Sequence, residues 1–269
     1  MNTEPLVAFM EELAHASAQE ILPRFGQRDL GLELKADDSP VTVADREAER
    51  VMRAMIEARF PSHGIVGEEF GTVRPDADFV WVLDPIDGTK SFISAVPLFG
   101  TLIGLLHKGQ PLLGCIHQPV LRQLMIGDGH VTTLNGSTVR ARRCDALAQA
   151  TMVVTDPLHP AQYRDAARYD SLCRKVRIVR TWGDCYGYLL VAAGWADLMV
   201  DPIMNPWDLL PVIPIIRGAG ATITQWDGNP AEATGANSAV AACPGLHAMA
   251  MEVLSPALHP PANNVTAAS

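Results

Sequence analysis

Hydrophobic positions in the first sixty residues recur at helical spacing in two segments. Residues 4–22 carry one such face, which predicts an amphipathic helix that ends before Pro23. After Pro40 the same spacing predicts a second helix, with an inner face of Ala44, Ala48, Val51, Met52, Met55, Ile56 and Phe60. Between the two, residues 32–40 mix alternation, charge and turn residues, so we expect an exposed hairpin or a mobile loop there.

The pattern then changes to that of a sheet. Residues 64–67 and 79–83 are short apolar runs, and the second is rich enough in aromatic and β-branched side chains to predict a strand buried on both faces. Pro85 is expected to end that strand in a tight turn closed by Gly88. Beyond it, glycine-containing turn pairs separate four segments that predict an antiparallel meander at 99–106, 112–116, 124–126 and 131–134.

The second half of the chain alternates strands and helices. Strands are predicted at 151–155, 176–179, 197–201, 221–226 and 239–243, and helices near 159–174, 185–193, 208–217 and 245–254. Such alternation is typical of an α/β architecture. We therefore expect an N-terminal α+β half at 1–142, a C-terminal α/β half at 143–256 and a disordered tail at 257–269.

The composition limits the classes of binding partner and the cellular compartment that we expect for this protein. The 269 residues carry a formal charge of -9 without a basic block, which argues against a nucleic-acid or membrane partner. The five cysteines include no Cys-x-x-Cys pair, so neither a disulfide framework nor a zinc knuckle is predicted, and we infer a reducing cytoplasm. The N-terminus is acidic, and no apolar run reaches the about eighteen residues of a membrane span, so we expect a soluble, non-exported protein.

Candidate metal-binding and anion-binding residues follow the predicted buried strand. Asp84 and Asp87 lie three apart in the predicted turn, so their carboxylates can converge on one cation, and oxygen ligands suit Mg²⁺. A helix that begins at Thr89 would aim the amides of Gly88 and Thr89 at an anion. The same residues also fit an ordinary Asx turn with a helix cap, and this pair alone favours that alternative.

Further acids stand at similar positions. Glu68 and Glu69 follow the strand at 64–67 and form a like-charged pair that needs solvent or cations around it. Asp45 lies in the first turn of the second helix, and Asp208 follows Trp207 at the start of a later one. Taken singly, each of these acids also fits a surface side chain or a helix cap.

Taken together, these motifs resemble the inositol monophosphatase superfamily. Gly67-Glu68-Glu69, the run from Asp84 to Thr89, and Trp207-Asp208 followed by Gly218-Ala-Gly220 match it in order and spacing over nearly the whole chain. The resemblance implies a layered αβαβα sandwich of mixed α+β and α/β character, a homodimer, and Mg²⁺-dependent hydrolysis of a small phosphate ester with two or three ions per active site.

The resemblance also implies metal ligands. Glu68, Asp84 and the carbonyl of Ile86 would hold one Mg²⁺, and Asp84, Asp87 and Asp208 would hold the second. Glu69 would be an occasional further partner.

Roles for the remaining residues follow from the same resemblance. Thr89, with Asp45 behind it, would orient the attacking water, and Glu68 would take part in catalysis through its metal. The amides of Gly88 and Thr89 would bind the phosphate oxygens. Lys35 would lie on the loop that closes over the site, although its composition alone fits solvated surface.

A narrower similarity concerns the substrate. Residues 84–100 and 182–186 are similar to the histidinol-phosphate phosphatases of the superfamily, enzymes of histidine synthesis. Asp184 lies where sugar-alcohol phosphatases carry small residues, and Asp201 stands seven residues before Asp208, where those enzymes carry an acid that contacts substrate hydroxyls. We hypothesise that Asp184, with Asp201, recognises the ammonium of histidinol phosphate.

Three alternatives stay open at this point. The first is an inositol or other sugar-alcohol monophosphatase with the same metal chemistry. The second is a 3′-phosphoadenosine-5′-phosphate phosphatase, which is disfavoured because Ser91 and Phe92, and no acid, follow the Asp-Gly-Thr-Lys stretch. The third is an inactive relative that serves as a binding protein, against which the full set of predicted ligands argues.

Overall fold

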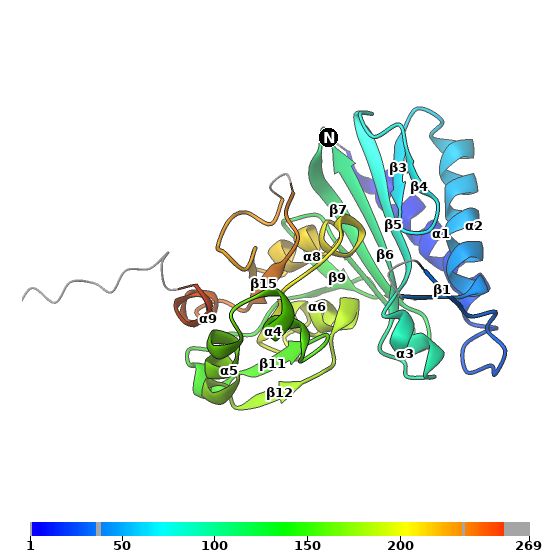
Figure 1. Ribbon diagram of the computed structural model, residues 1–269. Coiled ribbons are helices and arrows are strands. Elements are labelled where there is room, and N and C mark those ends of the chain that lie inside the picture. The colour runs from blue at the N-terminus through cyan, green and yellow to red at the C-terminus, as the bar shows by residue number, and fades with distance from the viewer. Residues whose placement is uncertain (1, 36–38, 233–234, 256–269) are drawn as a thin grey trace, which may run out of the picture.

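The computed structural model describes residues 2–35, 39–232 and 235–255, which fold into stacked layers of helix and sheet (Figure 1). The first layer consists of α1 (Glu4–Ile21) and α2 (Val43–Arg59), packed together against one face of an eight-stranded sheet. The strand order is β10-β9-β8-β7-β6-β5-β3-β4. Its strands are β3 (Gly64–Gly67), β4 (Gly71–Val73), β5 (Phe79–Asp87), β6 (Gly100–His107), β7 (Gln110–Gln118), β8 (Gln123–Gly127), β9 (Thr132–Leu134) and β10 (Ser137–Val139).

A second sheet of five strands, in the order β12-β11-β13-β15-β14, lies beyond the opposite face of the first. Its strands are β11 (Thr151–Val154), β12 (Ile178–Arg180), β13 (Leu198–Asp201), β14 (Thr222–Thr224) and β15 (Ala239–Ala242). Between the sheets lie α6 (Asp184–Ala192), α7 (Pro206–Leu209) and α8 (Val212–Gly218), and the outer face carries α4 (His159–Tyr163), α5 (Ala166–Lys175) and α9 (His247–Leu254). The predicted αβαβα layering is therefore confirmed.

Two predicted helices are interrupted. The prediction of one continuous helix near 159–174 is wrong, because Arg164 and the cap residue Asp165 adopt extended backbone between α4 and α5. The helix expected at 208–217 is likewise divided into α7 and α8, and Pro211 caps the second while Pro214 lies in its first turn. A proline in a first helical turn has no intrahelical hydrogen bond to lose, so Pro214 is accommodated there.

The hairpin expected at 32–40 is present as the paired strands β1 (Glu33–Leu34) and β2 (Pro40–Val41). The expected tail at 257–269 lies outside the described residues. The boundary between residues 142 and 143 remains a prediction, and one hydrophobic cluster draws on both sides of it, since Leu102 and Ile116 pack with Leu189. None of the helices in the described ranges is long and apolar enough to cross a bilayer.

Candidate metal and substrate site

A β-bulge in β5 includes three of the predicted metal ligands, which are Asp84, the carbonyl of Ile86 and Asp87. The strand does not end at Pro85 as the sequence predicts: it continues to Asp87, with a register shift after Asp84. A bulge tolerates proline because it leaves residues outside the regular ladder of hydrogen bonds. Asp84 pairs with Leu102 and Asp87 with Gly100, two residues apart on β6, so both carboxylates belong to the same face of the sheet.

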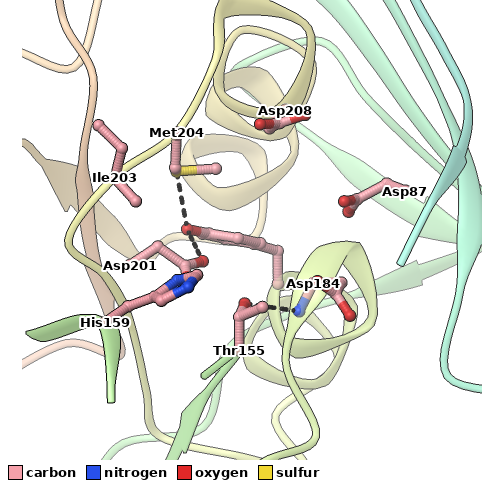
Figure 2. A pocket seen from close by; sticks show the side chains of 9 residues that line it. Asp87, Thr155, His159, Asp184, Asp201, Ile203, Met204 and Asp208 are labelled. Carbon is pink, nitrogen blue, oxygen red and sulfur yellow. Dashed lines mark hydrogen bonds between the residues drawn. The ribbon is translucent and has the colours of Figure 1, made fainter. Parts of the chain in front are cut away.

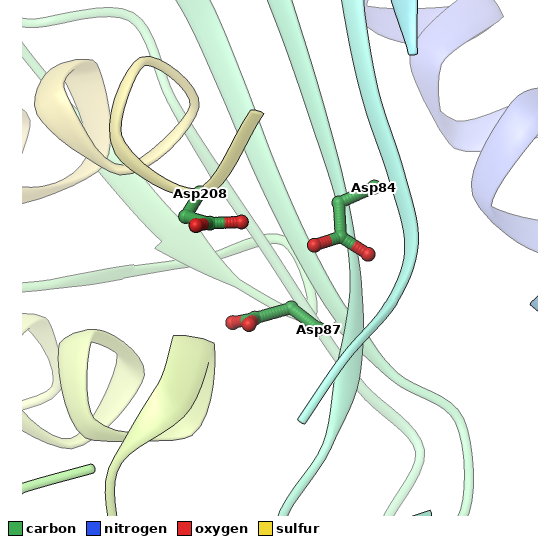
Figure 3. Close-up of side chains that lie close together, drawn as sticks. All are labelled: Asp84, Asp87 and Asp208. Atoms are coloured by element: carbon green, nitrogen blue, oxygen red, sulfur yellow. The ribbon is translucent and has the colours of Figure 1, made fainter. Parts of the chain in front are cut away.

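Asp208 completes this group from α7, the short helix that faces the bulge (Figure 3). One Oδ of Asp208 accepts the backbone N–H of Asn205 at 2.8 Å, so the side chain serves as a helix cap. One carboxylate oxygen from each of Asp84, Asp87 and Asp208 lies within 4.8 Å of the others. Asp208 can thus cap the helix and also contribute to a metal site, because its carboxylate has two oxygens.

The three carboxylates are poorly compensated by the protein. Burial, together with the charges of Glu68, Asp87 and Asp208, holds the pKa of Asp84 well above its ordinary value. Within the described ranges, the buried Oδ1 of Asp84 has no hydrogen-bond partner. Burial also raises the pKa of Asp208 to about 7. Converging oxygen ligands of this kind, left without cationic partners, fit a divalent cation such as Mg²⁺.

Glu68 lies next to this cluster because β3 runs parallel to β5. The two strands pair as far as Leu83, whose carbonyl accepts the N–H of Glu68 at 3.1 Å. The ammonium of Lys35 donates to Glu68 at 2.8 Å and to Glu69 at 2.7 Å. Burial disfavours the charged lysine, but the two carboxylates prevail and raise the pKa of Lys35. Lys35 thus supplies positive charge at the predicted metal ligand Glu68.

The predicted catalytic pair is engaged with neighbouring groups. Thr89 begins α3 (Thr89–Ile93), and its hydroxyl donates to the carbonyl of Ile86 at 3.0 Å. Asp45 accepts both the N–H and the hydroxyl of Thr42, in the capping box that starts α2. Burial raises the pKa of Asp45 to about 7, against these hydrogen bonds.

A small acidic cavity of about 70 Å³ adjoins the predicted metal-binding carboxylates (Figure 2). Asp87 and Asp208 form one side of it, and Asp184 and Asp201 also line it. Burial raises the pKa of Asp184 to about 7 and that of Asp201 to about 6. The structure therefore brings the two predicted specificity acids together next to the predicted metal ligands Asp87 and Asp208.

Sequence reasoning missed the neutral residues that hold these acids. The hydroxyl of Tyr188 donates to Asp201 at 2.8 Å, and the N–H of Asp184 donates to the Thr155 hydroxyl at 2.9 Å. Two signals pointed to them. Tyr188 stands four residues after Asp184, on the same helix face, and Thr155 follows β11, which runs parallel to β13 so that both strands end at one sheet edge.

A second cavity of about 300 Å³ opens on the other side of Asp184. Its lining includes Glu68, Gly88, Thr89, Lys90, Thr155 and Asp184. Gly88 has φ of +88°, and a Cβ at this position would meet Asp184 Oδ2 at 3.0 Å. Only glycine therefore fits comfortably between the bulge and α6, and Asp184 is shared by both cavities.

The raised pKa values predict how the metal-free protein responds to pH. Asp45, Asp184 and Asp208 have pKa values of about 7 when folded, above the ordinary aspartate value of 3.8. Between these values the folded state binds more protons than the unfolded state, so stability falls as the pH rises. In EDTA we expect Tm to drop by roughly 10 °C from pH 5 to pH 8.

Calorimetric melts at several pH values, with and without Mg²⁺, check this expectation. Mg²⁺ should remove most of the loss by neutralising the carboxylates, and Asp208→Asn should flatten the pH dependence in EDTA. A Tm in EDTA that rises between pH 5 and pH 8 would contradict it.

The layered fold agrees with that of solved structures of known proteins. The sequence model that describes the inositol monophosphatase family matches residues 2–259 of this chain. This chain belongs to the inositol monophosphatase family. It is accordingly a metal-dependent phosphatase of a magnesium-dependent family.

Two curated relatives and one solved structure of this family illustrate the match. The chain is 42% identical to the bifunctional phosphatase IMPL2 of Arabidopsis thaliana, over 90% of this chain and 72% of the relative. It is 41% identical to a histidinol-phosphatase of Chlorobaculum parvum, over 81% and 84% of the two chains. An inositol monophosphatase from Zymomonas mobilis superposes with a TM-score of 0.83 at 36% identity, covering 94% of this chain and 99% of that one.

Proposed function

We propose that this family member is a magnesium-dependent histidinol-phosphate phosphatase, which converts L-histidinol phosphate and water to L-histidinol and phosphate in histidine biosynthesis. The observation that carries the proposal is the shared cavity: Asp184 and Asp201 line the same small space as Asp87 and Asp208. A substrate whose phosphate is held at the metal carboxylates would present its leaving group to these acids. An ammonium group complements them, because it offers three donors and a positive charge. The identity to a histidinol-phosphatase supports the same substrate.

The proposed metal ligands are those expected from the sequence. Glu68, Asp84 and the Ile86 carbonyl would hold one ion, and Asp84, Asp87 and Asp208 the second. The orphaned oxygen of Asp84 and the converging carboxylates support this assignment. Bound magnesium would supply Lewis acidity toward the phosphoryl oxygens. Glu68 would then exchange the Lys35 ammonium for the ion, and Glu69 would keep Lys35 in place at the entrance.

The chain's own residues would bind and orient the reactants. The Thr89 hydroxyl donates its hydrogen bond to the Ile86 carbonyl. The lone pairs of its oxygen therefore remain able to accept a hydrogen bond from the attacking water. Asp45, with a pKa of about 7, is suited to accept a proton at neutral pH. The amides of Gly88 and Thr89 would donate to the phosphate.

An inositol monophosphatase activity is the second candidate, and the 36% identity to the Zymomonas mobilis protein favours it. Inositol hydroxyls both donate and accept hydrogen bonds, whereas carboxylates in their ionised form only accept. Two adjacent acids, Asp184 and Asp201, therefore match a cation better than a neutral polyol.

Phosphate release with Mg²⁺ decides between these substrates. Histidinol phosphate, inositol 1-phosphate and 3′-phosphoadenosine-5′-phosphate are compared at matched concentrations. We expect at least about a hundredfold preference in kcat/KM for histidinol phosphate, which corresponds to about 2.7 kcal/mol of transition-state discrimination. Comparable low rates on all three would refute the proposed substrate and leave the family chemistry in place.

Two further expectations and one test of an alternative accompany the proposal. We propose that the protein is a homodimer and works in the cytoplasm, and sedimentation equilibrium tests the first. An inactive binding protein would fail to take up two equivalents of Mg²⁺ in calorimetry, which separates that alternative from an enzyme.

A further inference from the structure

We infer that Thr101, with Ser17 behind it, is a positioning residue for the metal carboxylates. Thr101 lies on β6 between the partners of Asp84 and Asp87, so this single residue stands opposite both residues of the bulge, Pro85 and Ile86. Its hydroxyl donates to the carbonyl of Pro85 at 2.8 Å. The side chain of Thr101 thus makes a hydrogen bond to the bulge, where the regular backbone ladder is interrupted.

This bond satisfies a group that water does not reach. Pro85 is buried, and Thr101 has an exposure of 0%. Proline has no N–H, so its carbonyl is its one backbone hydrogen-bonding group, and a buried carbonyl without a partner is costly. The Thr101 hydroxyl therefore favours the bulged conformation over alternatives that would leave the carbonyl unpaired.

Ser17 on α1 adds a second hydrogen bond, so that Ser17, Thr101 and Pro85 form a chain of hydrogen bonds, which we call the relay. Its hydroxyl oxygen lies 3.0 Å from that of Thr101, and its exposure is also 0%. Since Thr101 gives its proton to Pro85, the proton between the two hydroxyls must come from Ser17. Ser17 otherwise stands on the apolar, buried face of its helix, where an unpaired hydroxyl would be unfavourable. The relay anchors the bulge to the first helical layer.

The bulge decides whether a metal site exists at all. In a regular strand, residues three apart point to opposite faces of the sheet, so Asp84 and Asp87 would face away from each other. The extra residue restores them to one face, where their oxygens lie within 4.8 Å of each other and of Asp208. Metal sites require their ligands to be held to within about half an ångström. The inference rests on the proposed metal centre, whose geometry the relay would maintain.

Calorimetric titration of Mg²⁺ into variants of the full chain tests this role. Thr101→Val keeps the shape of the side chain but removes the hydroxyl, and we expect Mg²⁺ affinity to fall about tenfold, as for residues that support metal ligands elsewhere. Thr101→Ser keeps the hydroxyl and should restore affinity to within about threefold of wild type. Ser17→Ala should weaken binding by an intermediate factor, because the bond to Pro85 remains.

Thr132→Val is a matched control. Thr132 is equally buried, and its hydroxyl donates to the carbonyl of Ile215 at 2.6 Å, between β9 and α8. It should lose thermal stability like Thr101→Val but bind Mg²⁺ as wild type does. Equal Mg²⁺ affinity in Thr101→Val and Thr132→Val would overturn the inference.

Two safeguards keep the test decisive. If Thr101→Val does not fold, Ser17→Ala decides, and wild-type affinity in that variant would count against the relay. The wild-type titration tests the metal centre by itself, so its failure is distinguishable from failure of the relay.

Discussion

Asp87→Asn should lower phosphate release at least a thousandfold while the circular-dichroism spectrum stays that of wild type. Asp87 is one of three carboxylates whose oxygens converge, and an amide oxygen is a much weaker ligand for Mg²⁺ than a carboxylate. The uncatalysed hydrolysis of phosphate monoesters is among the slowest known reactions. Loss of one metal ligand should therefore remove most of the observed rate.

The fold should survive because, among the residues that the structure describes, no cationic side chain pairs with Asp87. Its oxygen accepts the N–H of Cys185, and the amide oxygen of asparagine can accept the same bond. Burial and the charges of Asp184 and Asp208 raise the pKa of Asp87, so removing its charge should raise Tm in EDTA.

Asp197→Asn provides the contrast. Asp197 is fully buried, accepts the N–H of Thr151 at 2.7 Å and pairs with Arg142 through both oxygens. Breaking this pair should lower Tm by several degrees without abolishing turnover. Unfolding of Asp87→Asn, seen by circular dichroism, would show that Asp87 is structural.

Asp184→Asn should reduce kcat/KM for histidinol phosphate by about a hundredfold, mainly through KM, and leave inositol 1-phosphate within about threefold. Removing one partner of a buried charge pair typically costs 2–5 kcal/mol, which spans this factor. The backbone should tolerate the change, because Asp184 has φ of +50° and asparagine adopts this left-handed conformation at least as readily as aspartate.

Asp156→Asn is the matched control for this prediction. Asp156 lines the larger cavity, and its Oδ1 accepts the N–H of Leu158 at 2.8 Å, a bond that asparagine preserves. It should leave both substrates nearly unchanged. If Asp184→Asn keeps the wild-type KM for histidinol phosphate, the ammonium is recognised elsewhere and Asp184 does not set specificity.

The residues that we propose as metal ligands could be singled out from the sequence because their pattern is local. Asp84 and Asp87 come after the apolar run at 79–83, and Glu68 comes after the apolar run at 64–67. Parallel pairing of these two strands brings the acids to one edge. The error at Pro85 is also instructive. Proline is excluded from a regular central strand but is tolerated in a bulge. Whether a bulge forms depends on the partner strand, where Thr101 lies 16 residues from Pro85 in the chain.

The break within the helix predicted near 159–174 has a similar origin. The hydrophobic period continues across the interruption at Arg164, where the guanidinium reaches the carbonyl of Pro202 at 3.0 Å. That contact joins segments 38 residues apart, so it has no signature at local spacing.

The sequence by itself determined most of the helices and strands and the family, and it predicted the oxygen ligands, because hydrophobic periodicity and short motifs are properties of neighbouring residues. Only the tertiary structure decided that Asp84 and Asp87 share a face, that Lys35 neutralises Glu68 and Glu69, and that Ser17 reaches the bulge through Thr101. These relations join residues that are distant in the chain, and their geometry arises when the helices and sheets pack together.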